Sequence, residues 1–153
     1  MEKSTGEGGE MREVETNKAL VRREVEEVWN GRKLAVLDEI FAADFVNHDP
    51  NNPQVTDRES FKQWASAVLH GFPDLHLTID DVVAEGDKVA CRWTHHGTHL
   101  GELPGLPATG KKTTMMGMII YRFANGKVVE AWWSRDLLSL MQQLGVIPTP
   151  NQT

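Results

Sequence analysis

The sequence has few of the features that would support cross-linking, membrane insertion or binding to polyanions. Cys91 is its only cysteine, so no disulfide can form within the chain, and no apolar run approaches the roughly 20 residues that a membrane-spanning helix requires. Only 16 Lys and Arg stand against 22 Asp and Glu, which gives a net charge of -6. The first residues lack the apolar core of a signal peptide. We therefore expect a cytoplasmic protein that binds neither nucleic acid nor a membrane surface.

Motifs for several common catalytic and cofactor sites are also missing. The sequence has no G-x-S-x-G elbow, no P-loop and no G-x-G-x-x-G fingerprint, so nucleophilic serine chemistry and nucleotide binding have no support. Cys91 lies in a predicted strand and is interpreted as a small buried side chain rather than a nucleophile. His95 and His99 would stand about 13 Å apart along a straight strand, too far to share one ion. We expect no metal and no cofactor.

The order of the predicted elements indicates an α+β fold in one domain. Residues 1–13 are rich in Gly, Glu and Ser and are expected to form a disordered leader before a single domain over residues 14–153. Alternating apolar and polar residues predict antiparallel strands within residues 75–135. A curved sheet covered on one face by helices would enclose a cavity. Apolar residues at helical spacing predict three earlier helices, over residues 16–29, 34–42 and 56–70, the last opened by a capping box at Thr56.

Asp136 lies where the last predicted strand becomes the last helix. Strand-like alternation runs from Val128 to Ser134, and helical spacing follows from Leu137 to the terminating Gly145. A carboxylate held at the end of a strand could serve as a general acid or base. It could equally be only the N-cap of the helix, a position that Asp favours. Capping would lower its pKa and burial would raise it, so both interpretations stay open.

Three further polar residues are candidates for assisting such a carboxylate. His48 could act as an acid or hydrogen-bond donor, and Asn47 could orient a carbonyl group, although both could simply satisfy the loop that follows them. Arg92 could stabilise an oxyanion if its face of the strand turned toward the cavity. The opposite face carries Cys91, Trp93 and His95, and the sequence does not say which face is inside.

Large, soft side chains are expected to form the walls of a pocket. Indole and thioether groups suit a flat, largely apolar ligand, although core or subunit packing would use the same residues. The candidate wall residues are Trp64, Trp93, Met118 and Trp132.

Several stretches, in this order, resemble the SnoaL-like polyketide (ester) cyclases, a family within the NTF2-like superfamily. Together they cover nearly all of residues 17–147. They are FVNHDP at 45–50, GFPDL at 71–75, RWTHHGTHLG at 92–101, GLPATGK at 105–111, YRFANGKVVE at 121–130 and DLLSLMQQLG at 136–145.

The resemblance implies a cone-shaped fold and a cofactor-free intramolecular aldol ring closure. It also implies that Asp136 is the acid/base residue, that the substrate is a small apolar or aromatic carbonyl compound, and that the protein is a homodimer. The chain departs from the family pattern in the strand over residues 115–120, which has no polar side chain, and at Ala131, where many relatives have His.

Two other functions remain open. One is a non-catalytic protein that binds small apolar molecules, which the methionine-rich strand favours. The other is a different reaction on the same fold, such as isomerisation or dehydration, with Glu130 as a second carboxylate beside Asp136.

Overall fold

The computed structural model describes residues 4–150, and these form helices packed on one five-stranded sheet. The helical segments are α1 (Ser4–Arg23), the π-helix η1 (Glu24–Asn30), the 3-10 helix η2 (Leu34–Val36), α2 (Leu37–Ile40), α3 (Arg58–Gly71) and α4 (Leu137–Gln143). The strands are β1 (Phe41–His48), β2 (His76–Glu85), β3 (Lys88–Thr98), β4 (Lys112–Ala124) and β5 (Lys127–Arg135). The expected α+β fold is confirmed.

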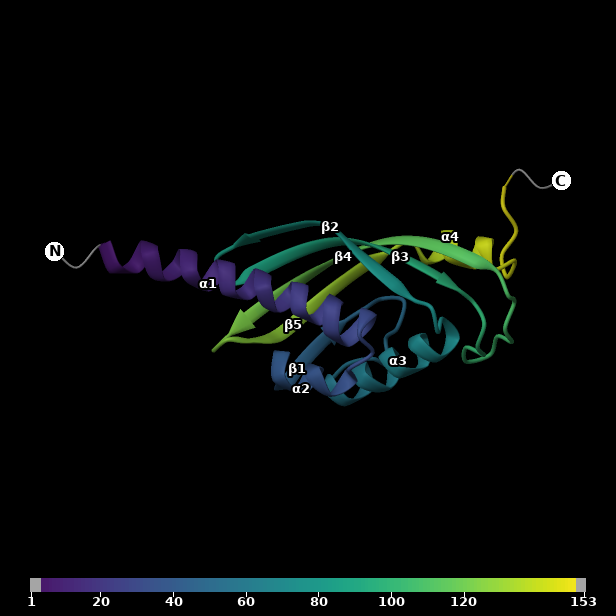
Figure 1. The fold of residues 1–153 in the computed structure, drawn as a ribbon, viewed down its shortest axis with the longest axis horizontal. Coiled ribbons are helices and arrows are strands. Elements are labelled where there is room, and N and C mark those ends of the chain that lie inside the picture. The colour runs from purple at the N-terminus through teal and green to yellow at the C-terminus, as the bar shows by residue number, and fades with distance from the viewer. Residues whose placement is uncertain (1–3, 151–153) are drawn as a thin grey trace.

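The sheet has the order β1-β5-β4-β3-β2 and is curved (Figure 1). Strands β2 to β5 are antiparallel, as predicted, while β1 joins the edge of the sheet parallel to β5. The β4–β5 hairpin turns at Asn125 and Gly126, which both have positive φ, as an Asn-Gly hairpin turn requires. In Figure 1, α2 and α3 lie together on one side of the long strands, and α4 lies at the end of the sheet opposite the N-terminus.

The helix boundaries differ from the predicted ones at three places. The first helix begins at Ser4 rather than near residue 16, so most of the predicted disordered leader is helical in the structure, and residues 1–3 lie outside the described part. The helix predicted over 34–42 ends at Ile40, because the chain becomes extended at Phe41 to pair with β5. Asp57, not Thr56, caps α3, with its side chain accepting from the Ser60 backbone N–H.

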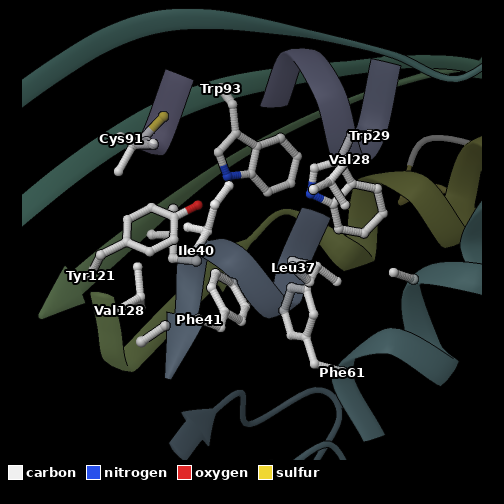
Figure 2. Close-up of a cluster of buried hydrophobic side chains, with 14 of the residues drawn as sticks. Val28, Trp29, Leu37, Ile40, Phe41, Phe61, Cys91, Trp93, Tyr121 and Val128 are labelled. Carbon is white, nitrogen blue, oxygen red and sulfur yellow. The ribbon is translucent and has the colours of Figure 1, made fainter. Parts of the chain in front are cut away.

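The core lies between the helices and the concave inner face of the sheet. Along β3, every second residue from Val89 to His95 is buried and the residues between them are not. The same alternation along β4 buries Met115 and Tyr121 and leaves Met118 half exposed. Figure 2 shows how side chains from η1, α2, α3 and the strands meet in this core. Strand alternation therefore decides which candidate residues can reach a cavity.

Candidate functional site

A cavity of about 700 Å³ lies between the inner face of the sheet and the helices. Most of its lining is apolar, with contributions from η1, α3, α4 and the strands β2 to β5. Four of the five tryptophans in the chain line it: Trp29, Trp64, Trp93 and Trp133. This concentration of indole rings in one cavity makes it the candidate site.

The four indoles form a connected set of edge-to-face contacts. Ring centroids lie 5.6 Å apart for Trp29 and Trp64, 5.6 Å for Trp64 and Trp133, and 6.2 Å for Trp93 and Trp133. Trp93 can lie across β4 only because residue 117 is glycine: a Cβ there would come within 2.3 Å of the Trp93 ring. Such a box of rings offers flat surfaces on which a planar ligand can stack.

Arg135 brings a buried positive charge into this aromatic box. It is the last residue of β5, and its guanidinium carbon lies 5.0 Å from the ring centroid of Trp64 and 5.9 Å from that of Trp133. Its Nη2 donates to the Asp49 carboxylate at 2.7 Å. With the Asn52 amide turned to suit its neighbours, the Asn52 oxygen accepts from Arg135 Nη2 at 2.7 Å and from the Trp64 indole at 2.9 Å.

Two nitrogens of Arg135 have no acceptor among the described residues. Its Nε is buried without an acceptor among the described residues, and within that same set Nη1 makes no hydrogen bond. Burial lowers the pKa of Arg135 and the charge of Asp49 opposes that effect. Guanidinium groups stay protonated in proteins, so the cavity holds a fixed hydrogen-bond donor balanced by one carboxylate.

His95 is the imidazole that lines the cavity. It is 3% exposed, and burial lowers its pKa to about 4, so the ring is neutral at neutral pH. The Thr113 hydroxyl donates to the Gly97 carbonyl at 2.9 Å and lies 3.5 Å from His95 Nε2. Because that hydroxyl has one hydrogen, Nε2 is assigned as the donor to Thr113, which leaves a lone pair on Nδ1. A neutral imidazole in this state can accept a proton from a ligand.

A buried carboxyl group lies behind the cavity wall. Glu24, at the start of η1, is 1% exposed and accepts hydrogen bonds from the Tyr121 hydroxyl and, at 3.2 Å, from the Trp29 indole. Burial raises the pKa of Glu24 to about 7, and the two hydrogen bonds oppose that rise. Tyr121 and Trp29 themselves line the cavity.

The structure places Asp136 outside this cavity. Its side chain is exposed and accepts from the Ser139 backbone N–H at 3.1 Å, so it is the N-cap of α4. Alternation along β5 explains the position, because Trp133 and Arg135 turn inward while residue 136 follows on the opposite side. Of the two interpretations left open by the sequence, capping is the one that the geometry shows.

Most of the other candidates also lie on the outer face of the sheet. Arg92 pairs with Asp81 at 2.7 Å on this face, and His48 contacts Glu130 at 2.7 Å. Met118 is 50% exposed on the outer face, and Trp132 stacks on the His48 ring at 5.5 Å rather than lining the cavity.

Three predicted residues do belong to the inner side. Trp64 and Trp93 line the cavity as expected. Asn47 is buried behind it, where its oxygen accepts from the Trp133 indole at 2.8 Å and its amide nitrogen donates to Val55 O at 3.1 Å. Both ends of Asn47 are therefore occupied, and it orients a wall residue rather than facing a ligand.

Arg135 and Glu24 were not among the predicted site residues, and His95 was considered only as a metal ligand. A simple signal existed for each. His95 and Arg135 follow Trp93 and Trp133 at the two-residue spacing of one strand face, and Glu24 interrupts the apolar stripe of Val21, Val25 and Val28 on the first helix. A charged residue inside an apolar stripe is expensive unless it is hydrogen-bonded, so it calls for an explanation.

Other possible sites are weaker. Within residues 4–150, no group of three His, Cys, Asp or Glu side chains is placed to hold a metal ion. No helix in the same described range is long and apolar enough to cross a membrane. A second hollow of about 630 Å³ lies between α1 and the β2–β3 and β4–β5 hairpins. Glu10, Glu13 and Asp87 are on its walls, and its lining contains no tryptophan.

Comparison with known proteins gives a consistent result. The model of the SnoaL-like polyketide cyclase family matches residues 19–144. The chain is 29% identical over 135 residues to the aklanonic acid methyl ester cyclase DnrD of Streptomyces peucetius, covering 86% of this chain and 92% of DnrD.

Solved structures agree with the family match. AclR from Streptomyces galilaeus, a proposed hydroxylase, superposes with a TM-score of 0.80 at 31% identity over 90% of this chain and 87% of AclR. IdmH from Streptomyces antibioticus, a proposed polyketide cyclase, gives a TM-score of 0.72 at 31% identity over 84% of this chain and 98% of IdmH.

Proposed function

Because the chain belongs to the SnoaL-like polyketide cyclase family, we propose that it is an enzyme that closes a ring in a flat, largely apolar carbonyl compound by acid/base chemistry. The observation that carries this proposal is the cavity walled by four tryptophans, with the positively charged Arg135 in its lining. The relatives named as cyclases support the reaction type.

The walls suit a conjugated ligand with several carbonyl groups. Indole faces stack on planar rings, and the enclosing apolar side chains exclude water from the reacting atoms. A proton between two carbonyl groups is acidic because its removal gives an enolate whose charge is spread over the carbonyl oxygens. The guanidinium of Arg135 would stabilise that developing charge more strongly in a dry cavity than in water.

Two residues are candidates for moving the proton. His95 lines the cavity and has a free lone pair in its assigned tautomer. Its low pKa makes it a weak base, which suffices only for a carbon acid whose enolate is stabilised. Asp136 is the alternative that the family resemblance implies, although its carboxylate is exposed and engaged as a cap. The geometry favours His95.

A second candidate function is binding without catalysis. The largely apolar lining favours it, and the methionines in that lining, Met115 on β4 and Met141 on α4, could adapt to ligands of different shape. A binder would hold the carbonyl compound without accelerating exchange of its acidic proton.

The test is exchange of the α-proton of an aryl β-keto ester in deuterated water, followed by NMR. We expect the protein to accelerate exchange over buffer and His95→Gln to lose most of the acceleration. Trp133→Leu should reduce it by altering the cavity wall. Trp132→Leu is the matched control, because it removes the neighbouring indole from the outer face and should leave exchange unchanged.

The possible outcomes separate the alternatives. Loss of exchange in Asp136→Asn but not in His95→Gln would assign the proton transfer to Asp136. Saturable quenching of tryptophan fluorescence by the ester without any acceleration would reject the enzyme and support the binder. Equal losses in the two tryptophan variants would show that the reaction does not take place in this cavity.

A further inference from the structure

The carboxyl group of Glu24 and the phenol of Tyr121 form a buried pair that the proposed ring closure does not yet use. Tyr121 lines the cavity from β4, and Glu24 holds its hydroxyl from η1. We propose that Tyr121 donates a hydrogen bond to a carbonyl oxygen of the bound ligand, and that Glu24 controls whether the phenol hydrogen is free to do so. This inference rests on the proposed function, because it requires a carbonyl ligand in the cavity.

Counting the hydrogens shared by Glu24, Tyr121 and Trp29 shows how Glu24 would control the phenol. An ionised Glu24 is an acceptor only, so its oxygens take the hydrogens of the Tyr121 hydroxyl and the Trp29 indole. A phenol has one hydrogen, and in this state the ligand receives none. A protonated Glu24 accepts from Trp29 with one oxygen and donates from the other to the Tyr121 oxygen. The phenol hydrogen is then released toward the cavity.

The local backbone supports a built site rather than an accidental contact. Glu24 and Trp29 are five residues apart, and their side chains meet because η1 is a π-helix, whose turn is wider than that of an α-helix. Such segments are rare and occur frequently at functional sites. In Figure 2, the Tyr121 hydroxyl points toward Trp93, and both residues line the cavity.

The surroundings leave Glu24 as the group of this cluster that titrates near neutrality. Burial raises the pKa of Glu24 to about 7 and that of the Cys91 thiol to about 12, while the pKa of Tyr121 rises well above its usual value. His95, farther along β3, stays neutral because its pKa is about 4.

The described elements that pack against Glu24 do not place a cation beside its carboxyl group. Within the described residues, no cation forms an ion pair with it. Strand β2 packs against the core with Ile79 and Val82, and η2 with Leu34. Arg22 and Asp80 act on the neighbouring Cys91 thiol with opposite effects on its pKa. The protonation of Glu24 therefore depends on its burial and on its hydrogen bonds to Tyr121 and Trp29.

The test uses the carbonyl stretch of 1-acetonaphthone labelled with carbon-13 at the carbonyl, a flat aryl ketone that cannot cyclise. In the wild type, the bound band should lie at lower wavenumber at pH 5.5 than at pH 8.5, with a midpoint near 7. Tyr121→Phe should give the higher band at both pH values.

Glu24→Gln provides the sharper comparison. Glutamine is neutral at every pH and can donate to the Tyr121 oxygen as the protonated acid does, so this variant should keep the lower band at both pH values. A merely structural role for Glu24 would not produce that result. If Glu24→Gln does not fold, the pH titration of the wild type beside Tyr121→Phe still shows whether the hydrogen bond from Tyr121 to the ligand changes with pH.

The outcomes distinguish this inference from the proposed function. If the ketone quenches tryptophan fluorescence saturably but Tyr121→Phe leaves its band unchanged, the Tyr121 assignment is overturned while the carbonyl-binding cavity stands. A wild-type band that does not change between pH 5.5 and 8.5 overturns the control by Glu24. If the ketone does not bind, the carbonyl-binding cavity of the proposed function fails, and this inference fails with it.

Discussion

The two faces of the sheet use the same residue types for different purposes. The inner face combines Trp93, Trp133 and Arg135 around a cavity, and the outer face combines Trp132 and Arg92 with half-exposed methionines. Each arginine has an acidic partner, and tryptophans occur on both faces. The comparison shows that residue type does not identify a site in this protein. The side of the strand does, because it decides whether a side chain meets water or a dry cavity.

Electrostatics differ between the faces for the same reason. The ion pair of Arg135 and Asp49 has side-chain exposures of 8% and 3%, whereas those of Arg92 and Asp81 are 39% and 61%. Water screens the outer pair, so its loss has little consequence. The inner pair has lost its hydration, and each partner depends on the other.

The largest expected effect comes from breaking these two ion pairs separately. Arg135→Met leaves the Asp49 carboxylate buried without its cation, and we expect it to lower the free energy of unfolding by roughly 3–5 kcal/mol. Arg92→Met should leave stability and α-proton exchange unchanged within error. Urea denaturation of both variants beside the wild type measures the difference.

A double variant provides the control for Arg135. Asn at position 49 carries no charge and can still accept from the Asn51 backbone N–H, as Asp49 does at 3.0 Å. Asp49→Asn combined with Arg135→Met should therefore recover most of the lost stability without restoring exchange. A single Arg135→Met variant as stable as Arg92→Met would show that the two faces do not differ in this way.

The apolar side chains on the outer face of β4 lead to the second prediction. Met116, Met118 and Ile120 are 52%, 50% and 43% exposed and lie in one row on the central strand of the sheet. We infer that this row is covered by a second copy of the chain in a homodimer, since exposed apolar clusters usually mark contacts.

Charge placed in this row should weaken the dimer. We expect Met118→Glu to raise the dissociation constant at least tenfold, about 1.4 kcal/mol, in sedimentation equilibrium. Met11→Glu is the control, because Met11 is 71% exposed on α1 rather than on β4. A monomeric wild type, or an equal change in both variants, would contradict the inference.

Much of the fold could be predicted from the sequence because its signals are local. Alternation, helical spacing and the Asn-Gly turn each depend on neighbouring residues, and the predicted strands of residues 75–135 were confirmed. The parallel pairing of β1 with β5 depends on contacts between residues distant in the sequence, and it was not predicted. The early start of α1 was missed because Gly and Ser are poor helix formers in isolation.

The site was less predictable because it depends on which strand face is buried. Alternation along the strand separates Arg92 from Trp93 and His95, but it does not show which of the two sets faces the helices. One fact would have settled the choice: every second residue of β3 packs against the helices, and Trp93 belongs to that set. Glu24 was missed because nothing local shows that Tyr121, 97 residues later, supplies its hydrogen bond.

The smallest predicted effect concerns Asp136, which lies at the border between the two faces. Its carboxylate caps α4, so Asp136→Ala should cost about 1 kcal/mol of unfolding free energy, whereas Asp136→Asn, which can still cap, should cost only a few tenths. Both should keep the wild-type rate of α-proton exchange, because the side chain does not line the cavity. Urea denaturation and the exchange assay on the same samples separate the two roles. If Asp136→Asn were as stable as the wild type and yet inactive, the carboxylate would have to turn into the cavity during the reaction. Asp136 would then act on the inner side, and its exposed position would not predict its role.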